Sequence, residues 1–226
     1  MIPLKDNITS RKIPIINYLF ITLNLIVFIY ELKLSAFDLL PVFITEWGVV
    51  PVRLINDFFN QFKTIFTSLF LHGGWLHFTG NMLYLYIFGD NVEDKLGHIQ
   101  YIFFYLFCGM FSILIQTLFS LNSEVPMIGA SGAIAGVMGA YFLLFPRAKI
   151  LTLLFFGFFV RIVPIPSFFY LGFWFFIQAW SGALSLATIP SSHNIGGIAF
   201  WAHISGFVFG AVWVLVINRN RRRRYW

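Results

Sequence analysis

Residues 128–136 read IGASGAIAG, in which Ser131 is the one hydroxyl residue among glycines and alanines. The stretch begins a long apolar segment, where a polar side chain is costly and is usually kept for a function. A serine in such a segment commonly bonds a backbone carbonyl one turn earlier and does nothing more. Glycines at positions 129, 132 and 136 indicate more than this, because small residues let another backbone approach closely. The stretch predicts a membrane helix packed against a partner, with Ser131 at the contact.

The composition of the whole chain is that of a polytopic membrane protein. Its 226 residues are 59% hydrophobic and 20% aromatic, only 11% are charged, and the mean hydropathy is +0.81. Soluble domains carry about 25% charged residues, so this chain has too few charges to cover a soluble surface. The net charge of +6 does not indicate nucleic-acid binding, since the densest basic run directly follows the last apolar segment and no folded domain accompanies it.

Six segments are candidates for membrane spans, each of which needs about 20 mostly apolar residues. They are 13–30, 69–88, 99–121, 127–145, 166–186 and 195–217, followed by a basic tail at 218–226. The second and fourth are short and interrupted by polar residues, so we expect them inside a ring formed by the others. No internal repeat or soluble domain is visible in the sequence. Residues 1–226 are therefore expected to form a single all-α membrane domain.

The remaining segments are read as connections. Residues 35–66 mix aromatic residues with isolated charges, which is typical of a structured loop lying in the membrane interface. Residues 150–160 are apolar but too short to span, so we expect an interfacial or cytoplasmic connector there. The first span follows basic residues and precedes no small-residue cleavage site, which favours an uncleaved span over a signal peptide.

The distribution of basic residues predicts the topology. With six spans both termini lie on one side, and that side collects twelve of the fifteen basic residues. They are Lys5, Arg11, Lys12, Lys95, Arg147, Lys149, Arg161, Arg219, Arg221, Arg222, Arg223 and Arg224, against Lys33, Arg53 and Lys63 on the other side. Positive residues favour the cytoplasm, so we expect cytoplasmic termini and outward loops at 31–68, 122–126 and 187–194. The final arginines are read as topology anchors, with contacts to anionic lipid as the alternative.

Four polar residues lie at similar predicted depth near the outward ends of three spans: Ser131, His203, His77 and Asn81. A serine becomes an effective nucleophile when a histidine within hydrogen-bond reach takes its proton. Ser131 and His203 would meet if an irregular segment such as NIGGIAF starts the sixth span late. No acidic residue is placed to orient the imidazole, so we expect a Ser–His dyad rather than a triad.

Small residues predict which spans touch. Gly132 and Gly136 are four residues apart on the fourth span, and Gly206 and Gly210 are four apart on the sixth. This spacing lets helix backbones approach closely. His203 lies one turn before Gly206, on the same side of the helix. The two spans are therefore expected to pack together; packing glycines beside an inert serine and histidine are the alternative.

The second span supplies candidate hydrogen-bond donors. His77 and Asn81 are four residues apart and share one helix face, and fixed donors of this kind stabilise the oxyanion of acyl transfer. A metal site is the weaker alternative, because His72 and His77 lack the HExxH arrangement and His98 falls on the cytoplasmic side. The single cysteine, Cys108, excludes an intramolecular disulfide and a cysteine-based metal site.

Three stretches resemble the rhomboid family of intramembrane serine proteases. They are TSLFLHGGWLHFTGNMLYLYIFGDNVEDKLG at 67–97, IGASGAIAGVMGAYFLLFP at 128–146 and WAHISGFVFG at 201–210. GxSG opening one span and AH followed by small residues in the last are that family's catalytic signatures. The resemblance extends to the six-helix layout in its compact prokaryotic form. It implies a multi-pass integral protein of a bacterial inner membrane.

The resemblance also implies roles for individual residues. Ser131 matches the nucleophile and His203 the general base, while His77 and Asn81 match the pair that forms the oxyanion hole with the Ser131 backbone N–H. The implied fold is a helical bundle with a water-filled cavity open to the outside and an interfacial first loop. The implied substrates are transmembrane segments of other proteins in the lipid bilayer, cut near the outer surface, without a metal or cofactor.

Two positions depart from the family pattern. Ala135 stands where some relatives carry an aromatic residue that stacks on the histidine, and Ser205 replaces a common glycine. These departures bear on orientation and rate rather than on the reaction class. The sequence therefore predicts an intramembrane serine endopeptidase. The alternatives are a catalytically silent relative that binds membrane helices, and an unrelated transporter, which would show matching halves.

Overall fold

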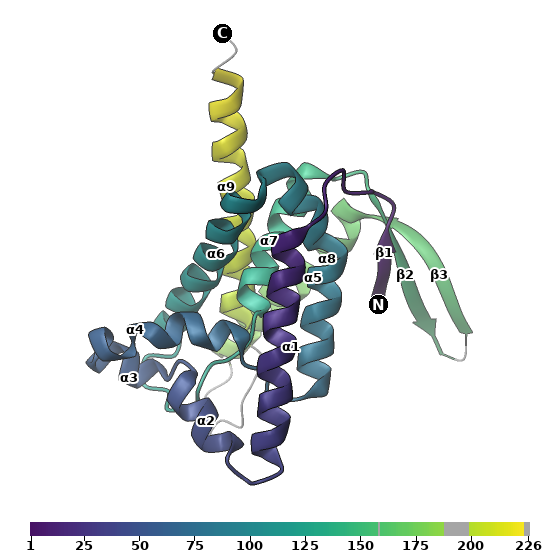
Figure 1. Ribbon diagram of the computed structural model, residues 1–226. Coiled ribbons are helices and arrows are strands. Elements are labelled where there is room, and N and C mark those ends of the chain that lie inside the picture. The colour runs from purple at the N-terminus through teal and green to yellow at the C-terminus, as the bar shows by residue number, and fades with distance from the viewer. Residues whose placement is uncertain (158, 188–198, 224–226) are drawn as a thin grey trace.

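The structure, a computed structural model, describes residues 1–157, 159–187 and 199–223. In chain order these residues form β1 Ile2–Asp6, α1 Ile15–Ser35, α2 Leu40–Trp47, α3 Pro51–Asn56, α4 Phe58–Thr67, α5 Trp75–Leu96, α6 His98–Leu118, α7 Ser131–Leu144, β2 Lys149–Phe156, β3 Phe159–Pro166, α8 Ser167–Ala187 and α9 Phe200–Arg223. The protein is mostly helical, as its composition indicates (Figure 1). The predicted outward loop after α8 and the first residues of the predicted sixth span lie outside the described residues.

Each of the six segments predicted as spans overlaps a helix of the described residues, and the ends differ. Within the described residues, α1, α6, α8 and α9 are long and apolar enough to cross a membrane. The other two are α7, with 14 residues, and α5, with 22 residues and a charged C-terminal end. The fourth predicted span begins at Met127, but α7 begins four residues later because Met127 exchanges backbone hydrogen bonds of 2.7 and 3.0 Å with Val49. The second predicted span begins at Leu69, but α5 begins only at Trp75, after a 3-10 turn over Ser68–Phe70.

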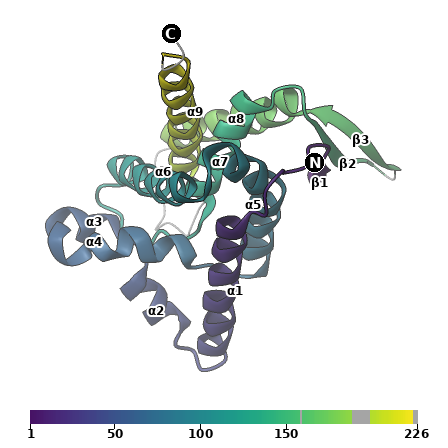
Figure 2. The same cartoon turned by 45° about the horizontal axis from the view of Figure 1, so that its top comes forward.

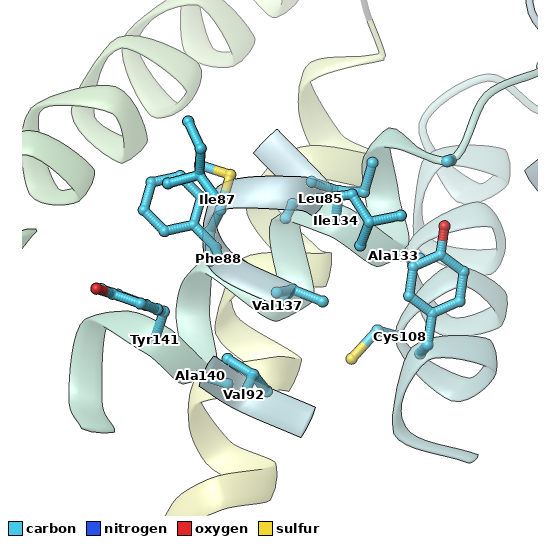
Figure 3. Close-up of a cluster of buried hydrophobic side chains, with 14 of the residues drawn as sticks. Leu85, Ile87, Phe88, Val92, Cys108, Ala133, Ile134, Val137, Ala140 and Tyr141 are labelled. Carbon is cyan, nitrogen blue, oxygen red and sulfur yellow. The ribbon is translucent and has the colours of Figure 1, made fainter. Parts of the chain in front are cut away.

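Helix α7 lies inside the bundle. Its residues from Gly132 to Tyr141 are all buried, and the helix contacts α5, α6, α8 and α9. Figure 3 shows Ala133, Val137 and Ala140 of α7 clustered with side chains of α5 and with Cys108 of α6. Small side chains on α7 let its neighbours come close, so the most tightly surrounded helix is the one that carries Ser131 at its start.

The predicted interfacial loop consists of short helices beside the bundle. Helices α2, α3 and α4 lie away from the sheet, on the other side of the helical bundle (Figures 1 and 2). Phe58, Phe59 and Phe62 of α4 are exposed, whereas Ile65 is fully buried against Leu69. Helix α4 therefore has one apolar face directed outward and one packed inward.

The expectation of an all-α domain is wrong for residues 149–166 and for the N-terminal segment. Strands β1, β2 and β3 form an antiparallel sheet in that order, with Lys149 paired to Pro166 at one end of the β2–β3 hairpin. The length of this segment excludes a span but does not distinguish a connector from a pair of strands. Its β-branched and aromatic residues, with Gly157 at φ +57° in the turn, are a hairpin signal. Pro164 and Pro166 are tolerated in β3 because it is an edge strand, where a missing backbone N–H need not break a hydrogen bond of the sheet.

The sheet is tied to the bundle through Asp6. The Asn91 side chain donates to Asp6 Oδ2 at 3.0 Å, and the Tyr141 hydroxyl donates to the same oxygen. Burial raises the pKa of Asp6 above its ordinary value, and the hydrogen bond from Tyr141 partly opposes this shift. Strand β1 thus joins the ends of α5 and α7 to the sheet.

An acidic side chain from α5 caps α1. Glu93 accepts hydrogen bonds from the backbone N–H groups of Ile16 at 3.0 Å and Asn17 at 2.7 Å, and it contacts His98 Nδ1 at 2.5 Å. Helix α1 has no side-chain cap of its own, and a negative group is favourable at a helix N-terminus. The C-terminal end of α5 therefore fixes the start of α1, and the two helices run in opposite directions.

Candidate active site

Ser131 is the first residue of α7. The turn before it contains Gly129 at φ +118°, a conformation that favours glycine, and the Gly129 N–H donates to the Ser68 carbonyl at 2.8 Å. The first N–H groups of a helix have no partner within that helix and carry its positive dipole end. The Ser131 hydroxyl and the first backbone N–H groups of α7 therefore lie close together.

His203 reaches Ser131 from the first turn of α9. Its Nε2 lies 2.8 Å from Ser131 Oγ, which is hydrogen-bond distance. Because α9 begins at Phe200 and α7 at Ser131, each side chain lies in the first turn of its helix. The segment expected to delay the start of α9 lies mostly outside the described residues, which resume at Ala199.

The glycines determine how closely α7 and α9 approach. A Cβ atom on Gly206 would lie 2.2 Å from the Gly132 carbonyl oxygen, and one on Gly210 would lie 2.0 Å from the Gly136 carbonyl oxygen. Real Cβ atoms do not come that close to backbone, so the helices touch backbone to backbone at successive turns. This contact brings the starts of the two helices together, and with them Ser131 and His203.

Two side chains of α8 hold His203, and neither was predicted. Gln178 Oε1 lies 2.8 Å from His203 Nδ1, and the Trp174 ring lies beside the imidazole with centroids 5.8 Å apart. Trp174 and Gln178 are four residues apart and share a helix face. The sequence signal for Gln178 is its position in the middle of an apolar span. A polar side chain is costly to place there, which makes it a candidate functional residue.

The two departures from the family pattern have structural explanations. Ala135 is fully buried, and the aromatic contact to His203 comes from Trp174 of α8 instead. The Ser205 hydroxyl donates to the Trp201 carbonyl of its own helix at 2.7 Å. Ser205 is therefore the inert kind of membrane serine, with its hydroxyl occupied one turn back.

His77 and Asn81 face the turn that precedes Ser131. A Cβ atom on Gly129 would lie 2.6 Å from His77 Nε2 and 3.8 Å from Asn81 Nδ2. The structure therefore brings both α5 side chains beside the start of α7, where the sequence places them. His98, the first residue of α6, lies beside Glu93 at the other end of α5. It is therefore far from His72 and His77, and the three histidines considered for a metal site do not converge.

His72 supports Asn81 and was considered in the sequence only as a metal ligand. Its Nε2 lies 3.0 Å from Asn81 Nδ2, and its ring makes an edge contact with His77 at 5.0 Å between centroids. The His72 backbone N–H donates to both carboxylate oxygens of Glu31 on α1, at 2.9 and 3.0 Å. An amide nitrogen carries two hydrogens, so Asn81 can bond His72 with one and keep the other for a ligand.

A cleft adjoins Ser131 and gives a reacting group room. It encloses about 320 Å³ of empty space, open solvent included, between the starts of α7 and α9 and the C-terminal half of α6. Its polar lining includes Ser68, Ser112 and Gln116. The Gln116 side-chain oxygen accepts a hydrogen bond from the Ala202 N–H at 3.1 Å, one residue before His203.

These features define a class: a helical membrane protein with a Ser–His pair, helix-terminal donors and a cleft at one end of its bundle. The family follows from comparison. Residues 60–220 match the family model of the Rhomboid domain, which is more than half of the chain. The chain belongs to the rhomboid family of intramembrane proteases.

Individual relatives are distant. The chain is 29% identical over 179 residues to Rhomboid protein 1, mitochondrial, of Saccharomyces cerevisiae, covering 76% of this chain and 47% of that protein. It is 29% identical over 177 residues to Rhomboid-like protein 11, chloroplastic, of Arabidopsis thaliana, covering 76% and 58%. It is also 30% identical over 127 residues to Rhomboid protease GluP of Bacillus subtilis, covering 56% and 24%. The chain spans about half the length of the first two relatives.

Proposed function

We propose that this protein is an intramembrane serine endopeptidase that cuts transmembrane segments of other membrane proteins. Ser131 is the nucleophile and His203 the general base. The observation that carries the proposal is the 2.8 Å contact between Ser131 Oγ and His203 Nε2. Family membership supports the reaction class, since a relative bears the name of a protease.

The reaction uses groups of this chain and needs no cofactor. His203 Nε2 takes the Ser131 proton while Oγ attacks the scissile carbonyl carbon. The resulting oxyanion accepts hydrogen bonds from the Ser131 backbone N–H, His77 and Asn81. The imidazolium then gives its proton to the leaving amine. His203 next takes a proton from a water molecule that attacks the acyl carbon, and it returns that proton to Ser131 Oγ as the acid product leaves.

The proposal includes a topology. Residues 1–226 form one domain, α1 and α5 to α9 cross a bacterial inner membrane, and the termini are cytoplasmic. The start of α1 and the end of α9 lie at one end of the bundle, while α7 and α9 begin toward the other end (Figure 1). Under this topology Ser131 and His203 lie toward the outer face, which suits substrates cut near that surface.

The proposal is tested by cleavage of a single-span model substrate in proteoliposomes, together with labelling by a fluorophosphonate. We expect the wild-type protein to cut near the outer end of the substrate helix and to carry the probe on Ser131. We expect Ser131→Ala to do neither. Folded wild-type protein that retains the substrate uncut and leaves Ser131 unlabelled would instead be a helix-binding protein.

We expect Asn81→Ala to slow cleavage without abolishing it. One oxyanion donor is typically worth about 10²- to 10³-fold in rate, and the Ser131 N–H and His77 remain. The measurement is kcat on the model substrate, with thermal unfolding as a check, because His72 loses its partner in this variant. Thr79→Ala is the matched control, since Thr79 is exposed and its hydroxyl donates to the Trp75 carbonyl within α5. A wild-type rate for Asn81→Ala would remove Asn81 from the mechanism.

A further inference from the structure

We infer that Gln178 positions His203 for the reaction, as a neutral third member behind the Ser131–His203 pair. The inference rests on the proposed function and deepens it, since a dyad alone was expected from the sequence. It assigns a role to α8, the helix that lies against the far side of His203 from Ser131. Gln178 touches neither the nucleophile nor the scissile bond, so it is a positioning residue.

The geometry occupies both nitrogens of the imidazole. Gln178 Oε1 lies 2.8 Å from Nδ1, and Ser131 Oγ lies 2.8 Å from Nε2. A neutral imidazole carries one hydrogen, and an amide oxygen can only accept. The Nδ1 hydrogen is therefore donated to Gln178, which leaves a lone pair on Nε2 for the Ser131 proton. Gln178 selects the one tautomer of His203 that can act as a base.

A second contact from the same helix fixes the plane of the ring. Trp174 lies one turn before Gln178 and packs beside the imidazole at an interplanar angle of 38°. Gln178 holds the ring at its edge, and Trp174 limits its tilt. Ala135 of α7, which has only a methyl group, leaves this support to α8.

A neutral amide suits the depth of the site. A carboxylate at this half-buried position would place a charge on an apolar helix, which is costly in a membrane. The amide accepts the same hydrogen bond without that cost. The amide stabilises the imidazolium of the transition state less than a carboxylate would. Removing the amide should therefore lower kcat by a smaller factor than removing the carboxylate of a charged triad does.

The test replaces Gln178 by methionine, which keeps the length of the side chain and removes the acceptor. We expect kcat and the rate constant for fluorophosphonate labelling of Ser131 to fall together by about 10- to 100-fold, the factor for one hydrogen bond to a charged group. We expect KM and the unfolding temperature to stay near the wild-type values. Gln178→Glu keeps an acceptor on a side chain of the same length, so it should restore the rate while lowering the unfolding temperature. Ile177→Met, on the exposed side of α8, is the matched control.

Two outcomes would overturn the inference. A wild-type labelling rate in Gln178→Met would show that Ser131 reactivity does not depend on the amide. A rise in KM with unchanged labelling would mean that Gln178 contacts substrate instead.

Nitrogen-15 shifts of His203 separate this inference from the proposed function, because they need no activity. The wild-type protein should carry its hydrogen on Nδ1, and Gln178→Met should shift the balance toward Nε2. A wild-type Nε2–H tautomer would exclude the positioning role, whether or not the protein cleaves peptides.

Discussion

Replacing Ser131 by alanine should lower kcat for cleavage by about 10⁴- to 10⁶-fold, and replacing His203 as well should cost almost nothing more. The two side chains are joined by one 2.8 Å hydrogen bond and act as a unit. Without the Ser131 hydroxyl, His203 has no proton to accept. Replacing His203 as well therefore removes no further contribution to catalysis. Residual cleavage would come from the oxyanion donors and from substrate binding.

The experiment is a double-mutant cycle with Ser131→Ala, His203→Ala and the double variant, measured by kcat on one model substrate. Ser205→Ala serves as the control, because it removes a hydroxyl from α9 close to His203 without touching the pair. We expect the control to cleave at nearly the wild-type rate. Additive losses across the cycle would show that Ser131 and His203 work independently, which the mechanism does not allow.

The central pairing could be predicted because its signals are local. A GxSG sequence at the start of one apolar segment and an AH sequence with glycines in another each mark a helix end and a packing face. A spacing of three residues then orients His203 and Gly206 to the same side of the helix. From such features the contact between two distant segments follows without coordinates.

The supporting residues could not be predicted, because they depend on which faces meet. Gln178 lies 25 residues before His203, and Glu31 lies 41 residues before the His72 backbone group it accepts from. Nothing in either local sequence indicates the partner. A polar side chain at membrane depth is costly, so Gln178 and Glu31 each stand out as candidates for a function. Their partners are seen only once α8 and α1 are packed in the bundle.

The β2–β3 hairpin was missed for a different reason. An apolar segment can be a span, a buried helix or a strand, and periodicity alone does not separate the last two. Residues 149–156 and 159–166 pair along their whole length, with Gly157 between them. The features that favour two strands are the β-branched and aromatic residues on both sides of Gly157.

Replacing Gly210 by alanine should destabilise the protein by about 2–3 kcal/mol, the range for overpacking a tight core. A Cβ atom at this position would lie 2.0 Å from the Gly136 carbonyl oxygen and 2.6 Å from its carbonyl carbon. Both atoms belong to backbone, which cannot rotate away as a side chain can. Ordinary contact needs about 3.5 Å, so α7 and α9 would have to separate by more than 1 Å.

That separation should also reduce activity, although Gly210 lies two turns from His203. The hydrogen bond between Ser131 and His203 spans the same two helices, so moving them apart lengthens it beyond its 2.8 Å. We expect the unfolding temperature and kcat to fall together in Gly210→Ala, and to fall further in Gly210→Val. Each would be measured in the same detergent on the same model substrate.

Gly80→Ala is the matched control for the two Gly210 variants. Gly80 lies within α5, and a Cβ atom there would meet nothing within 4 Å. Alanine is a better helix former than glycine by up to about 1 kcal/mol, so this variant should be as stable as the wild type or slightly more so. If Gly210→Ala matched Gly80→Ala in stability, the backbone contact between α7 and α9 would not exist, and the approach of His203 to Ser131 would need another cause.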